Sequence, residues 1–186
     1  GTRVAAAFLS MLLFSVLTTK NIINMDRSEE ASIAVNVLLS RAQKAEVAHY
    51  KWSSNLSNAL YAGTEFTGST DPTGCVLGQW LYGDAGTTDE TILNLRSQLE
   101  PLHKELHESA IYVLDLSEQD PEQAQKYYNE TIQSNLNVLV GLLDEVIERG
   151  TVLNDASIEN MRYTISVMHI VTASGLCLAL LCLLSL

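Results

Sequence analysis

The chain has 186 residues, which is enough for one domain together with membrane segments. Its hydrophobic content is 47%, aromatics make up only 6%, and glycine and proline are sparse, so an all-α fold is expected. The net charge is −11, and all 22 acidic residues lie between Asp26 and Glu159. Because no basic patch is available to neutralise phosphates, we expect no nucleic-acid partner.

Both ends of the chain are apolar and nearly free of charge. Residues 4–19 predict a first transmembrane helix, with a secretory signal peptide as the alternative interpretation. Residues 164–186 predict a second transmembrane helix, whose apolar run is about one bilayer thick. The two spans imply a membrane protein in which residues 20–163 form one domain on one side of the bilayer.

Two long helices are expected to leave these spans. The first runs from Lys20 to Gly63, with an apolar stripe that includes Ile33, Val37, Ala42, Ala45 and Trp52. The second begins at Pro121, with Asp120 as its N-cap, and continues towards the second span.

A shorter helix and a loop-rich stretch lie between the long helices. Asp89 is the predicted N-cap of a helix that runs to about Leu116, and Pro101 either kinks or restarts it. Residues 64–88 are rich in Gly, Thr and Asp, apart from a short amphipathic segment from Cys75 to Tyr82. The order and lengths of these elements along the chain predict an up-down-up-down four-helix bundle with a short Cys-bearing helix.

Helix lengths place one cysteine and three histidines at the same level of this bundle. At about 1.5 Å per residue, His49 lies roughly 45 Å from the membrane and His103 reaches nearly the same height. His107 is four residues after His103 and therefore shares its helical face. Cys75 has no evident disulfide partner, because Cys177 and Cys182 lie in the second apolar run.

One thiolate and three imidazoles form a closed tetrahedral ligand set for Zn²⁺. Such a set suits structure or sensing rather than hydrolysis, so no enzymatic activity is expected. The alternative interpretation is that these residues form no metal site. A histidine pair on one helical face is often only two partly exposed imidazoles, and a lone cysteine is often a small buried apolar residue.

Three short motifs carry a family resemblance. They are His49-Tyr-Lys-Trp52, Cys75-Val-Leu-Gly78-Gln-Trp80-Leu-Tyr82 and His103-Lys-Glu-Leu-His107. In order and spacing they resemble the chemoreceptor zinc-binding domain of bacteria, over about residues 40–150. The resemblance implies zinc held by His49, Cys75, His103 and His107, and a role in detecting zinc or oxidants such as hypochlorous acid.

The resemblance and the two spans together predict the sensor region of a transmembrane chemoreceptor in the bacterial inner membrane. The domain would lie outside the cytoplasm, in a homodimer, with a cytoplasmic signalling module following the second span. Two rivals remain open. In one, the zinc is only structural and a small molecule binds elsewhere in the bundle. In the other, an open zinc site belongs to a metalloenzyme.

Overall fold

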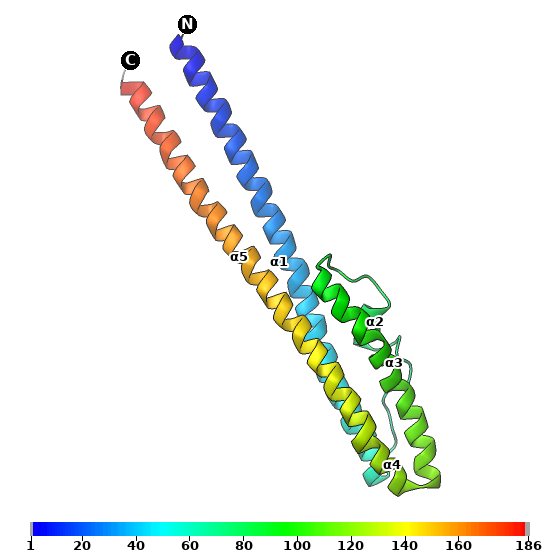
Figure 1. Cartoon of the computed structure of the whole chain (residues 1–186). Coiled ribbons are helices and arrows are strands. Elements are labelled where there is room, and N and C mark those ends of the chain that lie inside the picture. The colour runs from blue at the N-terminus through cyan, green and yellow to red at the C-terminus, as the bar shows by residue number, and fades with distance from the viewer. Residues whose placement is uncertain (1, 185–186) are drawn as a thin grey trace. The chain divides into compact units, whose positions relative to one another are not determined.

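The computed structural model describes residues 2–184, and the side chains among them except those of residues 2–4, 6 and 182–184. Helices dominate the described residues, as the composition predicts (Figure 1). They are α1 (Thr2–Ala62), α2 (Val76–Leu81), α3 (Glu90–Gln119), α4 (Pro121–Tyr127), the π-helical turn η1 (Tyr128–Ile132) and α5 (Gln133–Leu184).

The described residues divide into two compact units. Ala34–Val152 form one, called here the bundle unit, and the described residues of Gly1–Ile33 and Leu153–Leu186 form the other, called the helix-pair unit. Each is described separately below.

The bundle unit has an aliphatic core to which every one of its long helices contributes. Leu56 of α1, Leu99 and Leu106 of α3, and Leu139 and Leu143 of α5 are completely buried. Helix α3 packs against α2, α4 and η1. The stretch between α1 and α3, which holds the predicted short Cys-bearing helix, is mostly not helical. Residues 63–75 are irregular, and only the six residues of α2 are helical.

Local signals explain where the helices begin and end. Gly63 ends α1 with a φ of 66°, a conformation that favours glycine. The Asp89 and Asp120 side chains accept hydrogen bonds from Ile92 N and Gln123 N, as expected of N-caps. Pro101 lies inside α3 without ending it, so of the two expected alternatives, a kink or a restart, the restart does not occur.

The predicted stripe on α1 is correct in part. Ala42, Ala45 and Trp52 are buried, but Val37 is 48% exposed and the core position is taken by Leu38 instead. Ile33, in the helix-pair unit, is also exposed.

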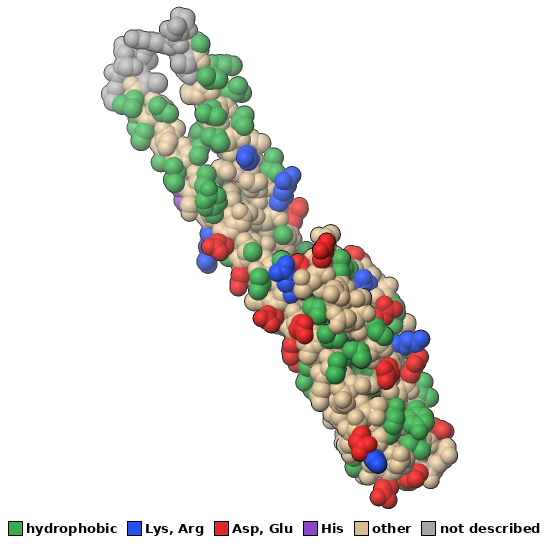
Figure 2. Space-filling view, viewed as in Figure 1, with side chains coloured by type: hydrophobic (Ala, Val, Ile, Leu, Met, Phe, Trp, Pro, Cys, Tyr) green, Lys and Arg blue, Asp and Glu red, His purple; other side chains and the backbone are tan. Residues whose placement is uncertain are grey.

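The helix-pair unit differs from the bundle unit in having polar side chains inside and apolar side chains on its surface. Ser28 and Ser32 of α1 are buried in this unit and bond to α5: Asn160 Nδ2 donates to Ser28 Oγ, and Ser32 Oγ donates to Asn154 Oδ1. Apolar side chains such as Phe8 and Leu176 face outward instead. In Figure 2, acidic side chains are spread over the bundle unit and hydrophobic ones cover the described ends of α1 and α5. The stretches Ala7–Ala62 and Pro121–Leu181 are long and apolar enough to cross a membrane, judged by length and composition.

Candidate metal centre

The structure brings together the four residues that the sequence singled out as metal ligands. His49 comes from α1, His103 and His107 from α3, and Cys75 stands directly before α2. One nitrogen from each histidine and the Cys75 sulfur all lie within 4.8 Å of one another. All three imidazoles are buried and the cysteine is half-buried. The arrangement provides one sulfur and three nitrogen donors, the usual composition of a closed zinc site.

Backbone carbonyls fix two of the imidazoles in a state that can bind a cation. His49 Nδ1 lies 2.7 Å from Ala45 O, and His107 Nδ1 lies 2.9 Å from Ser69 O. A carbonyl oxygen only accepts, so both Nδ1 atoms must carry the proton and both Nε2 atoms keep a lone pair. Those Nε2 atoms are buried and have no hydrogen-bond partner among the described residues. Two unpartnered lone pairs in one small space fit a bound metal ion.

The third imidazole faces the cysteine. His103 Nε2 lies 3.1 Å from Cys75 Sγ, and its Nδ1 is buried without a partner in the described part of the chain. Cys75 is the N-cap of α2, and its sulfur also accepts from Gly78 N at 3.3 Å. A donor at a helix N-terminus favours the negatively charged thiolate that zinc requires.

Burial keeps the site uncharged in the absence of metal. Desolvation lowers the pKa of His49 and of His107. It lowers the pKa of His103 to about 3, where the neighbouring His107 and His49 add smaller effects in the same direction. Desolvation also raises the pKa of the Cys75 thiol. The histidines are therefore neutral and ready to ligate, whereas metal binding must displace a proton from the cysteine.

Residues 67–69 bring a backbone acceptor to the site. Asn55 Oδ1 accepts from Thr67 N at 2.8 Å and from Gly68 N at 3.1 Å. Trp52 Nε1 donates to Ser69 O at 2.8 Å, the same oxygen that receives His107 Nδ1. Trp52 also contacts the His107 ring, with centroids 5.4 Å apart. Trp52 therefore both walls the site and joins its hydrogen-bond network.

Arg96 holds the short helix that follows Cys75. Its Nη2 donates to the carbonyls of Trp80, Leu81 and Gly83 at 3.1, 2.8 and 2.7 Å. These carbonyls lie at the C-terminal end of α2, where the last turn of a helix leaves acceptors without partners. Arg96 of α3 thus anchors α2 at the end away from Cys75.

Glu105 and Glu108 lie close to the histidines in sequence, but neither accepts a hydrogen bond from an imidazole N–H of the site. Glu105 accepts from Asn135, Glu108 pairs with Lys104 at 3.7 Å, and the imidazole partners are backbone carbonyls instead. Sequence reasoning missed Ser69 and Arg96. A backbone carbonyl carries no residue-type signal, and a single arginine in an amphipathic helix usually faces solvent.

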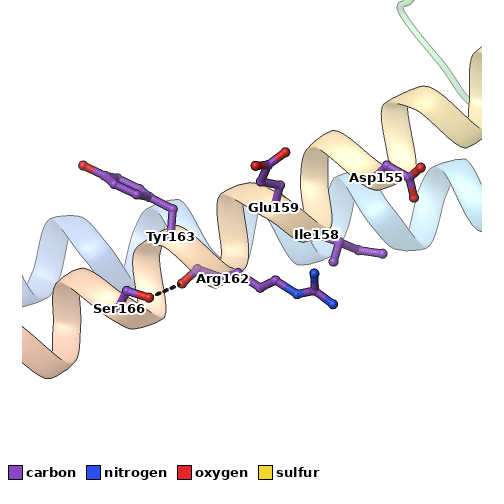
Figure 3. Close-up of a pocket in the computed structure, with 6 residues that line it drawn as sticks. All are labelled: Asp155, Ile158, Glu159, Arg162, Tyr163 and Ser166. Atoms are coloured by element: carbon purple, nitrogen blue, oxygen red, sulfur yellow. Dashed lines mark hydrogen bonds between the residues drawn. The ribbon is translucent and has the colours of Figure 1, made fainter.

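A surface recess on α5 lies apart from these residues, within the helix-pair unit. Figure 3 shows its lining along one side of the helix, with Ser166 Oγ donating to Arg162 O. The other lining residues are Asp155, Ile158, Glu159 and Tyr163. The recess is open to solvent and holds no convergent set of ligand groups, so it adds nothing to the metal chemistry.

Comparison with known proteins agrees with the geometry. Residues 49–114 match the family model described as the chemoreceptor zinc-binding domain, and this range contains all four candidate ligands. No curated protein and no solved structure matches the chain. Residues 49–114, about a third of the chain, are therefore identified as a region of the chemoreceptor zinc-binding domain type.

Proposed function

We propose that this protein is the zinc-binding sensor region of a transmembrane chemoreceptor of the bacterial inner membrane. It would detect zinc, or oxidants such as hypochlorous acid, at His49, Cys75, His103 and His107. The observation that carries the proposal is the convergence of one sulfur and three imidazole nitrogens within 4.8 Å, with the Nε2 atoms of two histidines buried and unpartnered.

Four protein ligands would fill the tetrahedral positions of Zn²⁺, so we propose a sensory rather than an enzymatic role. Bound zinc would hold Cys75 as a thiolate and staple α1, α3 and the segment before α2 together. The residues of the chain supply the rest. Ala45 O and Ser69 O orient the two imidazoles, and Arg96 keeps α2 in place.

Cys75 is the proposed point of oxidant attack. It is half-buried, so a small neutral oxidant can approach its sulfur. The thiolate would give two electrons to hypochlorous acid and take its oxygen and hydrogen, leaving a sulfenic acid and chloride. A sulfenic acid is a poorer ligand than a thiolate. The α2 segment, anchored by Arg96 but released at Cys75, would then shift and allow α3 to repack.

Side-chain polarity supports the proposed membrane placement. Apolar residues of the helix-pair unit face outward, which suits a lipid surroundings. We propose that residues 4–19 and 164–186 span the membrane, and that residues 20–163 lie outside the cytoplasm. A homodimer with a cytoplasmic signalling module after the second span completes the proposal. The rival function, a small-molecule receptor with structural zinc, predicts an unchanged ligand response when the zinc site is removed.

Metal content tests the function directly. The full chain, purified in detergent without added chelator, is expected to contain one zinc per chain by elemental analysis. Cys75→Ser should weaken zinc binding by more than the roughly 10–100-fold typical of an outer-shell change. Cys177→Ser is the matched control, because Cys177 is exposed and lies outside the cluster. A parent chain without stoichiometric zinc, or a Cys75→Ser variant that binds like the parent, would refute the proposal.

A further inference from the structure

The carbonyl of Ser69 serves two donors at once. His107 Nδ1 and Trp52 Nε1 approach the same oxygen, at 2.9 and 2.8 Å. We propose that this carbonyl sets the orientation of His107 for the metal, and that Trp52 and Asn55 are positioning residues that act through it. The inference rests on the proposed zinc site, and it assigns a role to residues 67–69, which contribute no ligand.

The two carbonyls that orient histidines differ in how they are held. His49 donates to Ala45 O, four residues earlier in the same helix, so helix geometry alone fixes that pair. Ser69 is 38 residues away from His107 in sequence and belongs to an irregular segment. The direction of the His107 lone pair therefore depends on how this segment is anchored.

The anchors come from one turn of α1. Asn55 Oδ1 receives two consecutive backbone N–H groups, from Thr67 and Gly68, and Trp52 donates to the next residue. Gly68 lies so close to the indole that a Cβ atom there would be 2.8 Å from Trp52 Cδ1. Only a residue without a side chain allows the backbone to approach the ring this closely.

The affinity for the metal should therefore depend on how well residues 67–69 are held in place. A metal bound by His107 Nε2 makes its Nδ1–H more acidic and strengthens the hydrogen bond to Ser69 O. Zinc should therefore protect the backbone of residues 67–69 from hydrogen exchange. Conversely, loss of the Trp52 donor should leave Ser69 O less well placed and reduce zinc affinity.

Trp80 provides a matched control for this idea. Its indole is also buried, and its Nε1 also donates to a loop carbonyl, Ala85 O, at 3.0 Å. That carbonyl receives no histidine. Trp52→Phe and Trp80→Phe thus delete the same kind of hydrogen bond and keep an aromatic ring, but only Trp52→Phe touches the acceptor of a ligand.

The experiment uses the full chain in detergent and measures zinc affinity by chelator competition. The visible absorption of the Co²⁺-substituted chain is recorded in parallel. Trp52→Phe is expected to bind zinc about tenfold more weakly and to shift the cobalt absorption bands. Trp80→Phe should stay close to the parent in both measurements. Equal affinity and spectra for Trp52→Phe and the parent, or equal losses in the two variants, would overturn the inference.

A second pair of variants covers the case in which Trp52→Phe fails to fold. Asn55→Ala removes the acceptor of Thr67 N and Gly68 N, whereas Asn55→Asp keeps an oxygen there. Asn55→Ala should lose zinc affinity and hydrogen-exchange protection at residues 67–69, and Asn55→Asp should restore both. No difference within this pair would contradict the inference. A parent chain that binds no zinc would instead refute the proposed function itself, which separates the two failures.

Discussion

The two units of this chain bury opposite kinds of side chain. The bundle unit buries leucines such as Leu56 and Leu99 and carries charges on its surface, whereas the helix-pair unit buries Ser28 and Thr164 and exposes large apolar side chains. Among the described side chains of the bundle unit, buried nitrogen atoms without a hydrogen-bond partner belong only to Arg96 and to the three histidines of the site. The contrast shows that the two units bury and expose opposite kinds of side chain; under the proposed function, one would be adapted to water and the other to lipid.

The largest expected effect comes from placing a lysine at one exposed apolar position in each unit. Leu176 of the helix-pair unit is 62% exposed and Ile111 of the bundle unit is 56% exposed. Leu176→Lys should weaken membrane insertion by about 2.5–3.5 kcal/mol if the surroundings are lipid. Ile111→Lys should change stability by no more than about 0.5 kcal/mol.

Alkaline extraction of membranes from cells that express the full chain measures the inserted fraction. Leu176→Lys should move into the soluble fraction, and Ile111→Lys should remain with the parent. If the two variants partition alike, the outward apolar face of the helix-pair unit is not a lipid-facing surface.

Part of this organisation was predictable from sequence. Asp89 and the Asp120-Pro121 pair locate helix starts because their side chains and ring geometry act locally. The histidines and Cys75 could be placed at one level because helical rise converts residue number into height. Ser69 O could not be found, since every residue has a carbonyl. Val37 was wrongly placed in the core because its neighbour Leu38, which takes that position, is also apolar, and hydrophobicity alone does not distinguish the two.

Within the bundle unit, the site depends on backbone packing that tolerates no added atom. A Cβ at Gly78 would lie 1.8 Å from Pro72 O, whereas a Cβ at Gly74 would be 3.7 Å from its nearest neighbour, Asp71 Oδ2. Gly78→Ala should therefore cost about 1–3 kcal/mol, as overpacking does, and displace Cys75 from the histidines.

Trp52 and Trp80 are the two tryptophans of the chain and both lie in the bundle unit, so intrinsic fluorescence reports its unfolding selectively. Denaturant titrations should show lower stability for Gly78→Ala, together with weaker zinc binding. Gly74→Ala should lose much less of either. Parent-like zinc binding by Gly78→Ala would show that the site does not require this close contact.

The smallest expected effect compares two glycines of α5 that lie in different units. Gly141 of the bundle unit is exposed, and a Cβ there would meet nothing within 4 Å. Gly141→Ala should stabilise the bundle unit by about 0.5–1 kcal/mol, because alanine loses less backbone entropy in a helix and adds no clash. In Gly175→Ala the new Cβ would lie 3.0 Å from the Phe14 ring, so the gain should be reduced or reversed. Denaturation followed by tryptophan fluorescence measures the first variant, and disappearance of helical circular dichroism on heating measures both. If Gly141→Ala destabilises the bundle unit, this side of α5 is covered by a partner rather than by water, and the solvent-facing assignment of the bundle surface fails there.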